Sequence, residues 1–283
     1  MIALLLFACT ADDPQTEDSV VKDTGTVDET LPPLPPAYSE GTCPDFSGDE
    51  VTFQSSGEDR EFLVLWPDEP VGAPLWFNWH WLGGSASESI RLQDLSEIAD
   101  LGYIVVVPEA RAAEDYEWAF YKGADDTLDL TFFDDVLGCM IEQYDIDRKR
   151  VYTTGMSAGG LWSTNLAMNR SEYLAAAAPL SGGTEPFQAY DVPTRDIPMM
   201  LTWGGPDDLF GGISFEDATF SLQASLEADG HFVLMCEHPY GHVLPPVGLE
   251  HVVEFFAAHE YGDALPWQDE LPSDLWSGCS LEL

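Results

Sequence analysis

Short apolar runs alternate along the chain with longer segments in which apolar side chains recur every three or four residues. The short runs predict buried strands, and the longer spacing predicts helices with one apolar face. Strands are predicted at 50–54, 60–66, 73–80, 103–108, 150–156, 174–180, 197–203 and 231–236, and helices at 88–99, 129–144, 161–170, 215–228 and 247–259. The first two strands form an opening hairpin, and the rest predicts an α/β domain whose mostly parallel central sheet has helices on both faces.

The first residues follow a different pattern. Residues 1–9 form an apolar run that is too short to span a bilayer as a helix. Its end, Leu6-Phe-Ala-Cys9, resembles the lipobox of a bacterial lipoprotein signal segment, which makes Cys9 the expected lipidation site. Basic residues do not precede the run, so a hydrophobic stub without a function is the alternative.

Residues 10–42 are rich in Asp, Glu, Thr and Pro. A segment of this composition buries too little apolar surface to offset the entropy lost on ordering, so we expect a disordered and self-repelling tether. Such a tether, directly after a lipidated cysteine, would hold a folded domain away from the membrane. Residues 43–283 are then expected to form one large α/β domain.

The composition is strongly acidic, with 51 Asp and Glu against 10 Lys and Arg, a formal net charge of −41 and an isoelectric point near 4.1. Nucleic acids and anionic membrane surfaces would be repelled by this charge, so neither is an expected partner. We interpret the excess of acid as a solvated surface rather than as a binding function.

Four cysteines follow Cys9, at Cys43, Cys139, Cys236 and Cys279. An even number in an exported chain suggests two disulfides, for which three connectivities are possible. Cys43 and Cys279 lie at the two ends of the predicted domain, so a bridge between them is favoured. The spacings do not fit a metal site, and no metal is expected.

The stretch Gly155-Met-Ser157-Ala-Gly159 lies between a predicted strand and a predicted helix. In a G-x-S-x-G elbow the glycines allow close contact with neighbouring elements, and the serine hydroxyl is presented above the sheet. Backbone N–H groups at the start of the helix favour negative charge there. Ser157 is therefore the predicted nucleophile.

A serine nucleophile needs a base, and the base needs a carboxylate, in the chain order serine, acid, histidine. Asp207 and Asp208 follow the strand at 197–203, and Asp207 is preferred because the preceding glycine turn brings it directly above that strand. His242 is the preferred base because its loop can reach Ser157. His238 is the rival base, and the remaining histidines are expected to be structural or on the surface.

Several motifs together resemble the secreted α/β-hydrolases that include polyhydroxybutyrate depolymerases and feruloyl esterases. They are Trp79-His-Trp-Leu-Gly-Gly-Ser85, Asp147 to Gly160 with its serine elbow, Trp203-Gly-Gly-Pro-Asp207 and Tyr240-Gly-His242. The resemblance covers about residues 51–258 and implies an α/β-hydrolase fold. It also implies an oxyanion hole made by the N–H groups of Leu82 and Ala158. Trp81 stands where the family usually has glycine.

Aromatic side chains are frequent near the predicted site, and three of them, Trp81, Trp118 and Trp203, are expected to bind substrate. The alternative for any one of them is a place in the core, which is less expected for Trp81 and Trp118 because they fall in predicted loops.

These observations predict a serine carboxylic-ester hydrolase that works through an acyl-enzyme, needs no cofactor, and acts as a monomer on small or polymeric esters. Polyester and feruloylated or acetylated polysaccharide both fit the same triad. The expected location is the cell envelope, with the lipid at Cys9 as the only membrane contact, or outside the cell. A serine peptidase of the same fold and a non-catalytic envelope binding protein are the alternatives.

Overall fold

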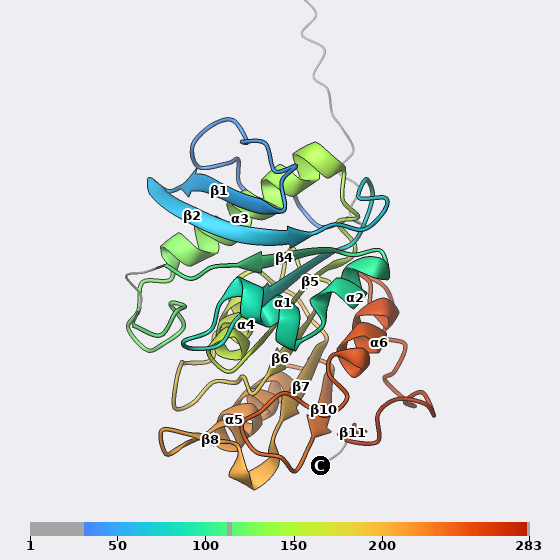
Figure 1. The fold of residues 1–283 in the computed structure, drawn as a ribbon. Helices are drawn as coiled ribbons and strands as arrows, with labels where there is room; N and C mark the ends of the chain where they lie inside the picture. The colour runs from blue at the N-terminus through green and yellow to red at the C-terminus, as the bar shows by residue number, and fades with distance from the viewer. Residues whose placement is uncertain (1–30, 112–114, 282–283) are drawn as a thin grey trace, which may run out of the picture.

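The computed structural model describes residues 31–111 and 115–281 and contains a central sheet of nine strands (Figure 1). In spatial order the strands are β1 (Glu50–Ser55), β2 (Glu58–Leu65), β4 (Ile104–Pro108), β3 (Leu75–Trp79), β5 (Val151–Met156), β6 (Ala176–Leu180), β7 (Met199–Trp203), β10 (Val233–Glu237) and β11 (Cys279–Ser280). The strands from β4 to β10 are parallel, whereas β1, β2 and β11 pair antiparallel at the two edges. The predicted opening hairpin and the mostly parallel sheet are confirmed.

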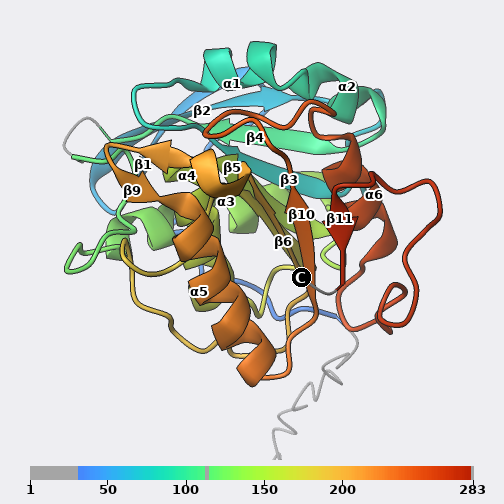
Figure 2. The same cartoon turned by 90° about the horizontal axis from the view of Figure 1, so that it is seen from below.

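Helices cover both faces of the sheet, and Figure 2 shows α1 and α2 on one side and α5 on the other. One layer consists of α1 (Ala86–Leu92), α2 (Leu95–Asp100) and α6 (Glu250–Ala258), and the other of α3 (Thr127–Tyr144), α4 (Ala158–Asn169) and α5 (Phe215–Ala228). Successive side chains of a strand point to opposite faces. Trp76 and Phe77 of β3 accordingly belong to different hydrophobic clusters, one under each helical layer.

The predicted helix at 88–99 is two helices in the structure. Asp94, between α1 and α2, has a left-handed backbone with φ of 52°. The preceding residue, Gln93, turns its amide inward and exchanges two hydrogen bonds with the buried Asn78 of β3, at 3.2 and 3.1 Å. This buried amide pair lies where the helix is interrupted, and apolar periodicity does not reveal it.

The N-terminal part of the described chain packs on the domain. The Arg148 guanidinium donates a hydrogen bond to the carbonyl oxygen of Pro32 at 2.8 Å. The N–H and Oγ–H of Ser39 donate to the Asp135 carboxylate on α3, at 2.8 and 2.6 Å. Residues 31–42, which composition places in the tether, are therefore part of the folded domain. Cys9 and the rest of the predicted tether lie outside the described residues.

The described part of the chain contains two disulfides, and their pairing differs from the favoured bridge between Cys43 and Cys279. Cys43 bonds to Cys139 of α3, with Cα atoms 5.5 Å apart. Cys236 of β10 bonds to Cys279 of β11, its partner in the antiparallel register. The favoured Cys43–Cys279 bridge is wrong because the first segment lies along α3 while the last one adds an edge strand to the sheet.

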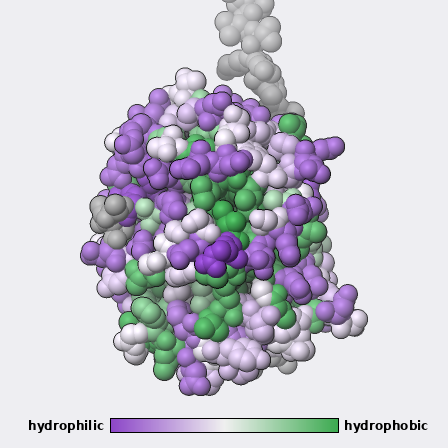
Figure 3. Space-filling view, viewed as in Figure 1, coloured by the Kyte–Doolittle hydropathy of each residue, from purple (hydrophilic) through white to green (hydrophobic). Residues whose placement is uncertain are grey.

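Figure 3 shows hydrophilic residues over most of one face of the molecule, with a band of apolar residues down its middle. Within the described ranges, no helix is both long and apolar enough to cross a membrane.

Candidate active site

The turn between β5 and α4 holds Ser157 in an uncommon backbone conformation, with φ of 58° and ψ of −117°. The turn is possible because the nearby glycines, Gly155, Gly159 and Gly160, have no Cβ to collide with neighbouring backbone. A Cβ on Gly159 would lie 2.0 Å from the carbonyl oxygen of Trp79, and one on Gly160 would lie 2.3 Å from that of Leu180. The glycines of the motif thus let α4 approach β3 and β6, which leaves the serine hydroxyl above the carboxyl ends of the strands.

His242 lies in the loop after β10, with its Nε2 atom 2.8 Å from Oγ of Ser157. The loop is tied to the end of β7, because the N–H of Gly241 donates to the carbonyl oxygen of Gly204 at 3.0 Å. The Phe215 ring packs over the imidazole with the ring centres 4.3 Å apart. The structure therefore brings together the two residues predicted as nucleophile and base.

The acidic partner of His242 is Asp208, and the preference for Asp207 is wrong. The Asp208 Oδ1 atom lies 2.6 Å from Nδ1 of His242, and its side chain is fully buried. Asp207 is exposed at the end of a short 3₁₀ turn, Gly205–Asp207. The turn has φ of +71° at Gly205, and the Asp208 carboxylate folds back over it toward the end of β7. It accepts a hydrogen bond from the N–H of Gly204 at 2.8 Å.

The charge state of Asp208 follows from its neighbours. Burial raises the pKa of this carboxyl, but hydrogen bonds from His242, the Gly204 N–H and the Ser181 hydroxyl together hold the pKa below its ordinary value. An ionised carboxylate can only accept hydrogen bonds. Nδ1 of His242 therefore donates to Asp208, which leaves Nε2 facing the Ser157 hydroxyl. When the imidazole is neutral, this nitrogen accepts the hydrogen bond from Ser157.

The chain is similar in sequence and fold to known hydrolases. A model of the prolyl oligopeptidase family, Peptidase_S9, matches residues 89–208, which include Ser157 and Asp208. The chain is 25% identical over 253 residues to oxidized polyvinyl alcohol hydrolase of Sphingopyxis sp. (strain 113P3), covering 64% of this chain and 68% of that protein. It is 32% identical over 151 residues to feruloyl esterase D of Neurospora crassa, covering 48% of this chain and about half, 50%, of that protein's length.

Among solved structures, that of native sOPH is similar over 86% of this chain and 97% of its own, with a TM-score of 0.68 and 20% identity. This likeness shows the fold. The chain has the α/β-hydrolase fold, and the relatives that it resembles include esterases. The fold and the resemblance predicted from the sequence are thereby confirmed.

Two amide groups lie close to Ser157 at this end of the sheet. Ala158 is the first residue of α4, where N–H groups have no acceptor within the helix. Leu82 lies in the loop after β3 and lines the surface next to Ser157. The loop is shaped by Trp81, whose carbonyl oxygen accepts a hydrogen bond from the N–H of Gly84 at 2.9 Å. A Cβ on Gly84 would meet the Trp81 indole at 3.0 Å, so glycine lets the indole pack against the loop itself.

Two pockets open on either side of Ser157, and Leu82 and Phe210 border both. The larger, about 450 Å³, extends past the start of α4, and the other residues that line it are Tyr116, Phe120, Tyr121, Lys122, Ala158, Leu161, Phe187, Gly211, Ile213 and Phe215. The smaller, about 320 Å³, lies on the His242 side, and its other lining residues are Trp81, Leu92, Met156, Val243 and Leu244. Among the described residues of both linings, Lys122 and His242 are the only basic side chains, and neither Asp nor Glu is present.

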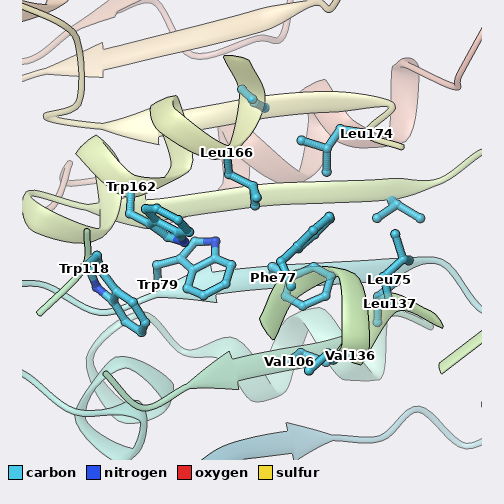
Figure 4. Packing of buried hydrophobic residues seen from close by; sticks show 14 of the residues in the cluster. Leu75, Phe77, Trp79, Val106, Trp118, Val136, Leu137, Trp162, Leu166 and Leu174 are labelled. Carbon is cyan, nitrogen blue, oxygen red and sulfur yellow. The ribbon is translucent and has the colours of Figure 1, made fainter. Parts of the chain in front are cut away.

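Of the three tryptophans expected to bind substrate, only Trp81 borders a pocket. Trp118 is fully buried, donates from its indole N–H to the carbonyl oxygen of His80 at 2.9 Å, and packs edge-on against Trp79. Figure 4 shows it beside Trp79 and Trp162 in the core. Trp203 is buried too and packs against Phe220 of α5. For Trp118 and Trp203 the prediction is wrong, because both side chains turn inward between the sheet and its helices.

The remaining described histidines take other places. His238, the rival base, is buried beside Tyr240, and burial lowers its pKa. His251 lies 3.1 Å from Oγ1 of Thr202, and burial lowers its pKa to about 3. His259 and His231 contact backbone groups. His80 is the buried first residue of the loop after β3, and its Nδ1 lies 2.9 Å from the carbonyl oxygen of Trp81. Over 31–111 and 115–281, no group of three or more His, Cys, Asp or Glu side chains is placed to hold a metal ion.

The turn at residues 204–208, which contains Asp208, is called the acid turn below. A hairpin of two short strands, β8 (Leu209–Phe210) and β9 (Ile213–Ser214), follows it and was not predicted. It places Phe210 between the two pockets. The signal in the sequence is Gly211-Gly212 between apolar residues, which is typical of a tight hairpin turn.

Proposed function

We propose that the protein is a serine carboxylic-ester hydrolase in which Ser157 is the nucleophile, His242 the base and Asp208 the acid of a triad. The observation that carries the proposal is the continuous chain of hydrogen bonds, 2.8 Å from Ser157 to His242 and 2.6 Å from His242 to Asp208. In such an arrangement the carboxylate holds the imidazole in the tautomer that can accept the serine proton.

The reaction begins when Oγ of Ser157 attacks the ester carbonyl carbon and Nε2 of His242 takes its proton. The imidazolium that forms is stabilised by the ionised Asp208. His242 then gives the proton to the departing alcohol oxygen as the C–O bond breaks, which leaves an acyl-enzyme on Ser157. A water molecule gives its proton to His242 and attacks the acyl carbon, and the acid leaves as Ser157 recovers its proton.

The N–H groups of Leu82 and Ala158 are proposed to hold the oxyanion of both tetrahedral intermediates. This proposal is supported by where the two residues lie. Ala158 starts a helix directly after Ser157, and Leu82 borders both pockets at Ser157. Loss of one such donor typically lowers kcat about 100-fold or more. Trp81 takes part as a wall of the smaller pocket.

The position of His242 suggests which part of the ester each of the two pockets would bind. Since His242 must protonate the departing alcohol, the alcohol side of the ester lies in the smaller pocket, which contains His242. The acyl side then occupies the larger pocket with Phe120, Tyr121 and Phe187. Both linings are mainly apolar, which favours esters with hydrophobic groups on both sides over acetylated polysaccharide, whose sugar hydroxyls would be left without partners.

The names of the relatives are consistent with this class. One is a hydrolase of oxidized polyvinyl alcohol, and another is a feruloyl esterase. A chain that passes through both pockets, with its reacting carbonyl at Ser157, fits the first, and an aromatic acyl group in the larger pocket fits the second. We propose hydrophobic polymeric or aromatic esters as the substrate class.

We further propose that the protein is exported and anchored through a lipid on Cys9, with the acidic segment after it as a spacer. Two disulfides support export, because such bonds persist in oxidising compartments. The test is metabolic labelling with a radioactive fatty acid: the full chain should be labelled, and Cys9→Ala should not. Recovery of the unlabelled full chain from the medium would refute the anchor and leave export standing.

A fluorophosphonate probe tests the reaction itself. The purified protein should be labelled with a stoichiometry of one at Ser157, and Ser157→Ala, which keeps the fold, should not be labelled. Hydrolysis of nitrophenyl esters should fall about 10⁶-fold in this variant. A folded wild-type protein that neither reacts with the probe nor cleaves any ester would refute the proposal and favour a binding protein.

A substrate panel with paired variants tests the pocket assignment. Phe187→Ala should raise KM for esters with a large aromatic acid, and Leu92→Ala should raise KM for esters with a large apolar alcohol. Each variant should leave the other series within about twofold, and a reversed result would exchange the two pockets. Including nitroanilides with the same acyl groups separates an esterase from a peptidase, since a peptidase would cleave both series.

A further inference from the structure

Ser181 lies directly after β6 and is buried, although it is neither nucleophile, base nor acid. Its hydroxyl donates a hydrogen bond to Oδ2 of Asp208 at 2.8 Å. The N–H of Gly204 donates to the same oxygen at 2.8 Å, while Oδ1 accepts from His242. The two oxygens of the carboxylate thus have separate partners, one facing the protein and one facing the base.

The backbone of Ser181 joins the two halves of the site. Its N–H donates to the carbonyl oxygen of Thr202 on β7, the strand that leads to the acid turn, at 2.7 Å. The residue before it, Leu180, accepts a hydrogen bond from the N–H of Ser157 at 2.9 Å. Ser181 therefore has a fixed position relative to both the nucleophile and the acid, so its hydroxyl can act as a rigid anchor.

The backbone conformation at this position is unfavourable for serine. Ser181 has φ of 45°, in the left-handed region where a Cβ is crowded and glycine is preferred. Glycine follows at the next two positions, but the buried residue that reaches the acid is a serine. Strained residues of this kind concentrate at functional sites, because the surrounding structure holds them in place for their side chains.

We infer that Ser181 is a positioning residue of the proposed esterase reaction. Its hydroxyl fixes the plane of the Asp208 carboxylate, so that Oδ1 stays directed at Nδ1 of His242 while the imidazole gains and loses its proton. Ser181 itself exchanges no proton with substrate. The inference rests on the proposed function, since it concerns the acid of the same triad.

Two variants at Ser181 separate the effect of losing the hydroxyl from the effect of relieving the backbone strain. Ser181→Ala removes the hydroxyl and keeps the Cβ, and Ser181→Gly removes the hydroxyl and relieves the strain. Both should lower kcat for a nitrophenyl ester by about 10- to 100-fold with KM within about twofold, since a hydrogen bond to a charged group is lost. The glycine variant should melt about 2–4 °C higher than the alanine variant.

Ser56 provides the matched control. It has φ of 50° in the exposed turn between β1 and β2, far along the sheet from the site. Ser56→Gly should raise the melting temperature and leave kcat unchanged. If Ser181→Gly regains wild-type kcat while Ser181→Ala does not, the effect belongs to the backbone, and the positioning role is refuted. Wild-type kcat in both variants also refutes it.

The activity of the wild-type protein distinguishes failure of this inference from failure of the proposed function. If the wild type reacts with the fluorophosphonate probe and cleaves esters but the Ser181 variants are equally fast, only the positioning role is wrong. If the folded wild type shows neither reaction, the proposed triad is wrong and takes the role of Ser181 with it.

Discussion

The nucleophile elbow and the acid turn lie side by side at the end of the sheet, but they are specified in different ways. The elbow is a local feature: strand, Gly155-Met-Ser157-Ala-Gly159 and helix are contiguous, and the glycines define which residue points outward. The acid turn offers two adjacent aspartates in a similar local setting. Packing against Ser181 and His242 makes Asp208 the buried one. A local motif thus points to one serine as the proposed nucleophile, whereas it does not distinguish the two aspartates as the proposed acid.

Both regions nevertheless depend on the same physical device, which is backbone contact allowed by glycine. Gly159 of the elbow would place a Cβ 2.0 Å from the carbonyl oxygen of Trp79, and Gly204 of the acid turn would place one 1.9 Å from that of Gly241. The first contact belongs to a known motif. The second joins the acid turn to the loop of His242, between residues that are far apart in the sequence.

Within this comparison, the largest effect is expected from the choice between the two aspartates of the acid turn. Asp208→Asn should lower kcat about 10⁴-fold, because the amide favours the wrong tautomer of His242. Asp207→Asn, one residue earlier and exposed, should change kcat by less than about twofold. Steady-state kinetics on a nitrophenyl ester measures both, and equal losses in the two variants would contradict the asymmetry between these neighbours.

The next largest effect is expected from two tryptophans near the site, one in the core and one at a pocket. Trp118→Ala should cost about 3–5 kcal/mol of unfolding free energy, since a fully buried ring is removed from the core. Trp81→Ala should cost less and should instead raise KM for esters with a large alcohol group. Urea unfolding and kinetics on each variant decide the matter. A stable Trp118→Ala protein with altered KM would restore the sequence-based assignment.

Glycine replacement compares the two backbone contacts directly. Gly159→Ala and Gly204→Ala should each destabilise the protein by about 3 kcal/mol, because the added Cβ overlaps a backbone oxygen that cannot move freely. Gly138→Ala, within α3 and with its nearest neighbour at 3.5 Å, is the control and should stabilise by about 0.5–1 kcal/mol. Unchanged stability in Gly204→Ala would mean that the acid turn and the histidine loop are not in contact.

The smallest effect concerns pH. The pKa of Asp208 is below its ordinary value of 3.8 in the folded protein, so its ionised form stabilises the fold. This contribution is complete above the ordinary pKa and is lost as the pH falls through the lower folded value. The difference in unfolding free energy between wild type and Asp208→Asn should therefore shrink as the pH falls below about 4. A difference that stays constant down to pH 2 would argue against a lowered pKa.

Much of the fold was predictable from apolar periodicity. Each of the eight predicted strands and the positions of α3, α4, α5 and α6 follow from short apolar runs and helical spacing. The break between α1 and α2 was not, because it depends on a hydrogen-bonded pair between Gln93 and Asn78, which are separated in the chain. The short edge strand β11 was missed for a similar reason, since its pairing with β10 comes with a disulfide.

The sequence by itself determined the class of fold, the serine at the elbow and the histidine that reaches it, because each depends on local periodicity or on a motif with a fixed chain order. Tertiary structure alone decided that Asp208 rather than Asp207 faces His242, that Trp118 and Trp203 belong to the core, and that the cysteines pair as they do. Adjacent residues of one type share almost the same local preferences. They are distinguished only by what packs against them, and those contacts come from distant parts of the chain.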